Sequence, residues 1–148
     1  MKIINFKTPE STQMDDKFLL NQLTKSFFNL FTNTNGKKPD FESIDDICLN
    51  ETIIIKKDKD NEEVYTLDSF ITPRKKILTD GTLIEFEEYE VNEETKIVNN
   101  IAQRFSKYQK HGYLNGNYFE GNGTKFFQYV KTAKGWKINS VIWEDENI

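Results

Sequence analysis

The stretch GTKFFQYVKTAKGWKINSVIWE, residues 123–144, decides how we assign the fold. It contains two runs rich in aromatic and β-branched residues, 123–132 and 136–144, separated by Ala133-Lys134-Gly135. Two such runs joined by a short connection that contains Gly are typical of a β-hairpin. We expect a three-residue loop over 133–135, with Gly135 in a left-handed conformation.

Two more strands, near 82–92 and 97–109, precede this hairpin, because apolar and polar residues alternate there. We centre the connection between the strands at 97–109 and 123–132 on Gly116. The connection between the strands at 82–92 and 97–109 is centred on Thr95. The resulting register pairs are Thr132 with Trp136, Val130 with Ile138, Gln128 with Ser140, Phe126 with Ile142, Ala102 with Val130, Arg104 with Gln128, Ser106 with Phe126, Phe86 with Arg104 and Glu88 with Ala102.

The first half of the chain has the pattern of helices. Apolar residues from Leu19 to Phe31 recur at steps of one, three and four, which places them on one helical face. Thr12 followed by Asp15 has the spacing of a capping box. Asp40 can cap a short second helix.

A β-branched run predicts a strand over 51–57, and the chain returns over 62–67 after a turn at 58–61. A third helix follows over 68–79, for which we prefer Asp68 as the cap over Thr72 with Pro73 at the first helical position. Together these elements predict an α+β fold with three N-terminal helices packed on a curved antiparallel sheet, in one domain over 1–148.

The registers divide the last four strands between two faces. The inner face is mostly apolar and suits packing under the helices, but Glu88, Arg104, Gln128 and Ser140 cross its middle. Glu88 and Arg104 are close enough in this register to pair across strands. The outer face carries an aromatic patch that is large for a monomer and predicts a two-fold homodimer. Its interface residues are Phe105, Phe127, Tyr129, Val141 and Trp143.

Composition excludes several classes of function. The net charge is −4, from 24 acidic and 20 basic residues, so a nucleic-acid partner is not expected. One Cys and one His argue against a disulfide framework and a zinc site. No apolar run is long enough to span a membrane and no signal peptide is recognised, so we expect a cytoplasmic protein without a membrane partner.

Known catalytic motifs are missing from the sequence. It has no Gly-rich phosphate loop, no Gly-x-Ser-x-Gly and no His-Glu-x-x-His, and we expect no metal and no cofactor. Asp58, Asp60 and Glu62 begin like a calcium loop, but Glu63 stands where Gly is needed. We interpret His111 as a residue of a surface loop and Cys48 as a small core residue.

Two segments, Ile101–Tyr108 and Phe127–Ile138, resemble the nuclear transport factor 2-like superfamily, and in particular its SnoaL-like bacterial branch of unknown function. The likeness includes Lys131-Thr132, Gly135-Trp136, the ending Trp143-Glu144-Asp145, and the helix Leu67–Leu78 with Arg74. It covers about 15–146 of the chain. It implies a cone-shaped fold in which the sheet wraps around three helices, a cavity at the open end, and a dimer through the outer sheet face.

The resemblance leaves the activity open, because its members include isomerases, dehydratases, hydrolases and adaptors. Epoxide-hydrolase relatives use a carboxylate–arginine arrangement inside the cone. Ketosteroid-isomerase relatives carry a carboxylate on the strand that corresponds to 52–57, where this chain has Ile53, Ile54, Ile55 and Lys56. That difference argues against ring isomerisation.

We therefore expect the cone cavity to bind a small, partly apolar molecule whose polar end is held by Arg104 and Gln128. The candidate ligand-binding residues are Arg104, Gln128, Glu88, Tyr108, Ser140 and Tyr65. One alternative is a small-molecule hydrolase or isomerase, with Glu88 as base and Arg104 stabilising charge. Another is a dimeric interaction module without a ligand.

Overall fold

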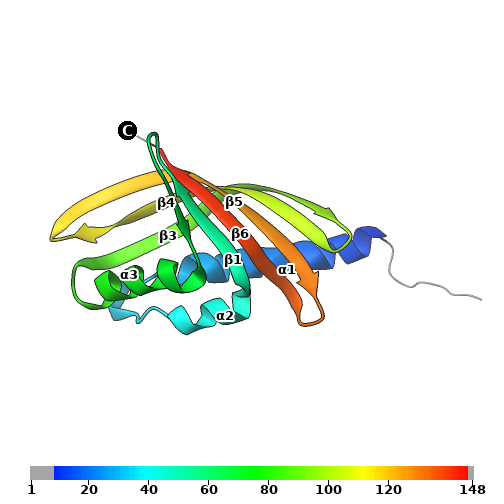
Figure 1. Ribbon diagram of the computed structural model, residues 1–148, viewed down its shortest axis with the longest axis horizontal. Coiled ribbons are helices and arrows are strands. Elements are labelled where there is room, and N and C mark those ends of the chain that lie inside the picture. The colour runs from blue at the N-terminus through cyan, green and yellow to red at the C-terminus, as the bar shows by residue number, and fades with distance from the viewer. Residues whose placement is uncertain (1–8, 147–148) are drawn as a thin grey trace, which may run out of the picture.

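The computed structural model describes residues 9–146, with side chains from Asp15 onward. Three α-helices lie against one face of a six-stranded sheet (Figure 1). The helices are α1 (Pro9–Asn29), α2 (Ile44–Ile47) and α3 (Leu67–Thr79). The strands are β1 (Cys48–Lys57), β2 (Glu62–Tyr65), β3 (Leu83–Val98), β4 (Ile101–Leu114), β5 (Asn117–Thr132) and β6 (Gly135–Asp145).

The α+β class is confirmed, but two details of the predicted architecture are wrong. The strand order is β2-β1-β6-β5-β4-β3, and β1 lies parallel to β6, so the sheet is mixed rather than antiparallel. Helix α3 follows β1 and β2, so the three helices are not all N-terminal. Local hairpin signals cannot reveal the β1–β6 pairing, because the two strands are far apart in sequence.

The helix starts differ from those expected. Thr66 caps α3 through a capping box with Ser69, two residues before the predicted cap Asp68. Helix α1 begins at Pro9, so Thr12 lies within the helix, and its side chain is outside the described ones.

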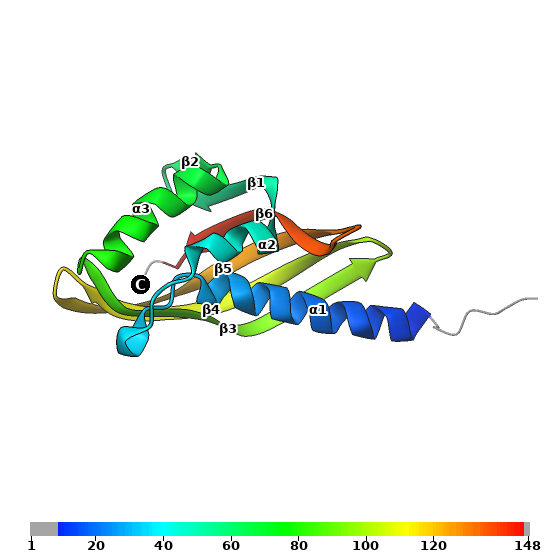
Figure 2. The ribbon, with the colours of Figure 1, turned by 90° about the horizontal axis from the view of Figure 1, so that it is seen from below.

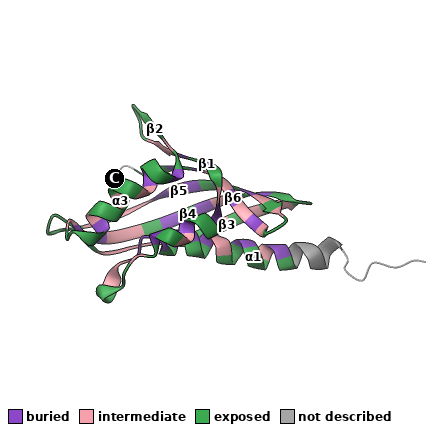
Figure 3. Ribbon diagram, turned by 60° about the horizontal axis from the view of Figure 1, so that its bottom comes forward, coloured by how far each residue is buried: buried purple, intermediate pink, exposed green. Residues whose placement is uncertain are grey.

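The sheet curves around α1, as the view from below shows (Figure 2). Buried and more exposed positions alternate along β4 and β5, so that one face of each strand packs beneath the helices (Figure 3). Phe27 of α1 contacts Phe127 of β5 edge to face, with ring centroids 5.5 Å apart. Such aromatic contacts between α1 and the sheet form the core of the cone.

The predicted β4–β5 register is wrong by one residue. The turn is the two-residue pair Asn115-Gly116, both with positive φ (52° and 82°), rather than a long loop centred on Gly116. Arg104 therefore lies opposite Phe127, not Gln128. Because side chains alternate between faces, this shift moves every β5 side chain to the other face.

The β3–β4 hairpin turns at 99–100, not at Thr95. The polar segment 92–95 looks like a turn in the sequence, yet it forms a strand, because Glu93 and Thr95 find polar partners on the inner face. Neither predicted pair of this hairpin forms: Glu88 lies opposite Lys110, and Arg104 lies opposite Thr95.

The β5–β6 register is confirmed in part. Gln128 pairs with Ser140 and Phe126 with Ile142, as predicted. Nearer the turn, Thr132 pairs with Gly135, whose φ of 99° is left-handed, and a bulge after Gln128 absorbs the extra residue. Gln128 and Ser140, predicted on the inner face, lie on the outer face together with Phe126 and Ile142, which are exposed.

The predicted dimer interface must be corrected accordingly. Phe127, Tyr129, Val141 and Trp143 are at most 7% exposed and pack in the core. Only Phe105 of the five lies on the outer face, where it contacts Phe126 at 5.5 Å between ring centroids. No helix within residues 9–146 is long and apolar enough to cross a membrane.

Candidate functional site

The predicted pair of Glu88 with Arg104 does not form. The structure divides the buried charges of the inner face into two separate groups, one around Arg104 and one around Glu88. The first fills the space between α1, β3 and β4. The second lies beside a cavity between α3 and the β4–β5 hairpin, at the open end of the cone.

Arg104 is held by a closed polar network. Its guanidinium donates to both carboxylate oxygens of Glu90, at 3.0 Å from Nε and 2.6 Å from Nη2. Nη1 donates to the Asn21 side chain at 2.8 Å and to the Thr95 hydroxyl at 3.1 Å. Burial alone would lower the pKa of Arg104, but the bond to Glu90 raises it. The group is fully partnered, which is typical of a structural ion pair.

A bulge in β3 makes this network possible. The register shifts between Glu90 and Asn92, so Glu90 before the bulge and Glu93 after it both face Arg104. Ser106 also donates to Glu90, at 2.6 Å.

The second group borders a cavity of about 580 Å³, here called the cone cavity. Its wall is mainly apolar and aromatic, with residues from α1, α3 and all six strands. The ionisable groups in the wall are Lys56, Glu63, Tyr65, Arg74, Glu88, Lys110, Lys125 and Asp145. A mostly apolar hollow with a few convergent polar groups is the usual form of a small-molecule site.

Lys125 and Glu88 form a buried ion pair in this wall. Lys125 Nζ lies 3.1 Å from Glu88 Oε1, and the two side chains are 5% and 11% exposed. The ammonium group also lies over the rings of Tyr108 and Trp143, at 4.2 and 4.6 Å from their centroids. Burial lowers the pKa of Lys125, and the attraction of Glu88 offsets this only in part.

Next to this ion pair, the Asp145 carboxylate accepts hydrogen bonds from two side chains. The Tyr108 hydroxyl donates to Oδ1, and Lys110 Nζ donates to Oδ2 at 2.9 Å. Burial alone would raise the pKa of Asp145, but these two donors hold it below its ordinary value. Burial and the bond to Asp145 raise the pKa of Tyr108, so the phenol stays protonated.

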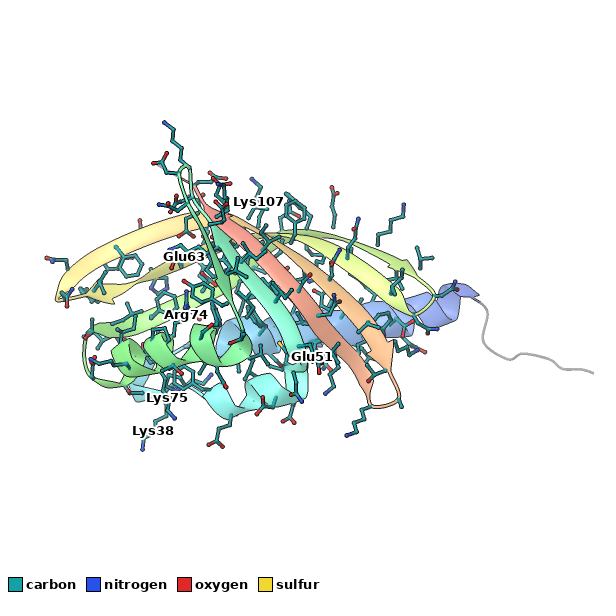
Figure 4. The ribbon with its side chains drawn as sticks, viewed as in Figure 1. Lys38, Glu51, Glu63, Arg74, Lys75 and Lys107 are labelled. Carbon is teal, nitrogen blue, oxygen red and sulfur yellow. The ribbon has the colours of Figure 1, made fainter. Side chains whose placement is uncertain are left out.

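Arg74 projects from α3 toward the strands, whereas its neighbour Lys75 points away (Figure 4). Its guanidinium carbon lies 3.9 Å from the centre of the Phe70 ring and 5.3 Å from that of Tyr65. Nη1 donates to the Phe70 carbonyl oxygen at 3.0 Å. The Tyr65 hydroxyl in turn donates to Glu63 at 2.6 Å.

Three of the six predicted ligand-binding residues belong to this region. Glu88 and Tyr65 line the cone cavity, and Tyr108 packs beneath Lys125. Arg104 lies in its own network, away from the cavity wall. Gln128 and Ser140 bond to each other on the outer face, with Ser140 Oγ donating at 2.9 Å.

The sequence interpretation missed Lys125, Lys110, Asp145 and Lys56, and it assigned no role to Arg74. The signal that places Lys125 inside was present: Asn-Gly is among the strongest markers of a two-residue hairpin turn. A turn at Asn115-Gly116 puts Lys125 opposite Ser106 on the inner face.

The other singled-out residues do not join the cavity. His111 lies on β4 rather than in a loop, with Nε2 3.3 Å from Glu87. Cys48 is buried in the core, as predicted, and burial raises the pKa of its thiol to about 12, so it is a poor nucleophile. Among the described residues, no group of three or more His, Cys, Asp or Glu could hold a metal ion.

A second hollow, of about 670 Å³, lies beside Ile101, Gln103 and Gln128. Lys96 is the one charged side chain in its wall, and most of its lining comes from β4 and β5. We take the cone cavity as the candidate site, although its volume is smaller, because several charged groups converge on it.

Comparisons with known proteins establish the fold. No protein-family model matches the chain, and no curated protein matches it. Solved structures do match over most of the chain. A nuclear transport factor 2-like superfamily protein from Salmonella enterica serovar Typhimurium aligns with a TM-score of 0.74 at 12% identity, covering 92% of this chain and 94% of that one.

Two further structures align equally well. The Kfla4162 protein from Kribbella flavida has a TM-score of 0.76 at 12% identity, over 91% of this chain and 93% of its own. A hexachlorocyclohexane dehydrochlorinase (LinA) Type2 has a TM-score of 0.73 at 11% identity, over 91% and 88%. The chain therefore has the nuclear transport factor 2-like fold, which confirms the resemblance at the level of fold.

Proposed function

We propose that this chain, with its nuclear transport factor 2-like fold, binds a small, partly apolar molecule in the cone cavity. The observation that carries the proposal is the gathering of seven charged side chains and Tyr65 in the wall of an otherwise apolar hollow of about 580 Å³. Charged groups are costly to bury, and their concentration at one cavity is characteristic of functional sites. Within this fold, membership of the SnoaL-like branch stays a prediction.

The cavity offers partners for both ends of such a molecule. Phe86 and Phe119 stack in the cavity wall with ring centroids 6.3 Å apart and can contact the apolar part of the molecule. Arg74 and Lys125 supply hydrogen-bond donors for its polar end. The polar end is therefore held by these two side chains, in place of Arg104 and Gln128.

The neutral dye Nile red tests this proposal, because its fluorescence rises in apolar surroundings. We expect saturable binding of one dye per chain. Ile77→Trp adds bulk to the cavity wall and should abolish that binding, while Lys75→Trp, on the exposed side of the same helix, should leave it unchanged. Loss of binding in Phe126→Ser instead would place the dye on the outer face and contradict the proposal.

A second candidate function is catalysis on the bound molecule, by hydrolysis or isomerisation. The supporting observation is the Glu88–Lys125 pair at 3.1 Å in the cavity wall, which can accept and return a proton. Glu88 keeps the proposed role of base, while Lys125 replaces Arg104 as the group that stabilises charge. In a screen of small esters, epoxides and enolisable ketones, Glu88→Gln should abolish any turnover that Lys107→Gln retains.

We also propose a homodimer through the outer sheet face. Register pairs place Phe105, Phe126, Ile142 and Ile55 in one row across β4, β5, β6 and β1. Phe126 and Ile142 are 51% and 42% exposed, which leaves a contiguous apolar row uncovered. Sedimentation should give a dimer for the wild type and a monomer for Phe126→Glu, while a dimer in both would exclude this interface.

A further inference from the structure

The cations and carboxylates around the cone cavity are unequally matched. Its wall carries four Lys and Arg side chains but three Asp and Glu side chains. Each of the two deepest carboxylates already has a cation: Glu88 has Lys125, and Asp145 has Lys110. Glu63 accepts from Tyr65 at the exposed rim. The acidic groups are therefore occupied, and the surplus charge is positive.

Lys56 and Arg74 are the two cations left over by these pairs, and of the two only Arg74 carries the planar donor fork that fits a carboxylate. Among the described residues, no carboxylate lies within 4.0 Å of its guanidinium, in contrast to Arg104 with its bidentate Glu90. Its hydrogen bond goes to the neutral Phe70 carbonyl oxygen, and its next polar neighbour is the Tyr65 hydroxyl. A guanidinium has five N–H donors in a planar fork, so donors remain for a partner.

The surroundings make an anion the fitting partner. Phe70 covers one face of the guanidinium at 3.9 Å, which removes it from water on that side. Burial lowers the pKa of Arg74, and Glu88 and Glu63 act on it only at longer range. A carboxylate accepts two parallel hydrogen bonds from a guanidinium group, and these bonds would offset the free-energy cost of removing the guanidinium from water.

We infer that the cone cavity selects an amphipathic monoanion, a carboxylate on an aromatic or aliphatic body, and that Arg74 binds its charged end. This inference rests on the proposed function and names its ligand class. The apolar body packs against the aromatic side chains Phe70, Phe86 and Phe119, which line the same cavity as Arg74. The centre of the Trp143 ring lies 5.7 Å from the guanidinium carbon of Arg74, so Trp143 borders the place where the ligand carboxylate would bind.

A pair of probes that differ only in charge tests the inference: 2-naphthoate and its neutral amide, 2-naphthamide. Equilibrium dialysis at pH 7 against the full chain gives both affinities. We expect naphthoate to bind at least tenfold more tightly than the amide. Arg74→Gln should reduce this ratio to below threefold by weakening the binding of naphthoate alone. Lys75→Gln removes a charge from the exposed side of the same helix and should leave the ratio unchanged (Figure 4).

Arg74→Lys keeps the charge without the planar fork, and it serves as the second variant if Arg74→Gln does not fold. It should give a ratio between those of the wild type and Arg74→Gln. If the wild type binds the two probes equally, the inference is overturned but the proposed function stands. The same conclusion follows if the ratio of naphthoate to naphthamide affinity is unchanged in both Arg74 variants. Binding of neither probe would overturn both.

Discussion

Replacement of Arg104 by Met distinguishes a structural ion pair from a ligand-binding residue. The substitution keeps a long apolar side chain but removes four hydrogen bonds, two of them to Glu90. It leaves the Glu90 carboxylate, with a side chain 20% exposed, without its guanidinium. Loss of one partner of a buried ion pair costs about 3–5 kcal/mol. Because Glu90 keeps some contact with water and with Ser106, we expect about 3 kcal/mol.

Urea unfolding followed by circular dichroism measures this loss. For a domain of this size, about 3 kcal/mol corresponds to a fall in Tm of roughly 10 °C. Lys107→Met is the matched control on the same strand. Its ion pair with Glu146 is exposed, so its loss should cost no more than about 1 kcal/mol. Adding Glu90→Gln to Arg104→Met should recover part of the lost stability, since no uncompensated charge then remains.

Ligand binding supplies the second readout. Folded Arg104→Met protein should bind Nile red and naphthoate as the wild type does, because Arg104 lies outside the cone-cavity wall. The reasoning is refuted if Arg104→Met has wild-type stability and has lost binding. That result would restore Arg104 as the residue that holds the ligand.

Other parts of the fold give further predictions. Gly123→Ala should destabilise by about 1–3 kcal/mol in urea unfolding, because its Cβ would overlap the Tyr108 hydroxyl and the Glu144 carbonyl oxygen, whereas Gly121→Ala, which meets only the flexible end of Lys110, should cost less than about 0.5 kcal/mol. The pKa of Asp145 is lower in the folded protein than in the unfolded chain. The ionised carboxylate therefore stabilises the folded state above the ordinary carboxyl pKa, and this contribution is lost as pH falls through the pKa of the folded state. Tyr108→Phe together with Lys110→Met should therefore flatten the fall in stability between about pH 5 and pH 2, and an unchanged slope would show that other carboxylates dominate. Lys125→Met should destabilise more than Lys125→Met with Glu88→Gln, since the single variant leaves Glu88 buried without a cation; equal losses would mean that the pair is not coupled.

The sequence was sufficient to predict the fold class and the main hairpin. The β5–β6 pairs Gln128–Ser140 and Phe126–Ile142 were predicted correctly, but only because the bulge after Gln128 offsets a one-residue error at the turn, where Thr132 pairs with Gly135 rather than Trp136. The helical stripe of α1 was predicted in part: Leu20 and Phe27 pack in the core, whereas Leu19 is 45% exposed, and the buried Phe31 lies beyond the helix end at Asn29.

The sheet face on which each β5 side chain lies was predicted wrongly, because the turn between β4 and β5 was misplaced. Placing the turn centre at Gly116 rather than between Asn115 and Gly116 shifts the register by one residue and exchanges the two faces. That error placed Phe127 and Tyr129 at a dimer interface and Lys125 beside them on the outer face, whereas all three are buried.

The composition of the site depends on contacts that local patterns do not encode. Glu88 and Lys125 are 37 positions apart and meet only because β3, β4 and β5 curve together. Arg74 comes from α3, whose position over the sheet is set by core packing around Phe70 rather than by any motif. Residues of this kind become visible only after the sheet order and register are known.

The nitrogen-15 spectrum of the two Trp indole N–H groups tests the cavity-binding account most directly. Trp143 lines the cone cavity, while Trp136 lies outside its wall and donates from Nε1 to Asp16 at 3.0 Å. Titration with 2-naphthoate should move the Trp143 resonance in a saturable manner and leave that of Trp136 in place. A shift of Trp136 alone, or no shift of Trp143 at saturating naphthoate, would contradict ligand binding in the cone cavity.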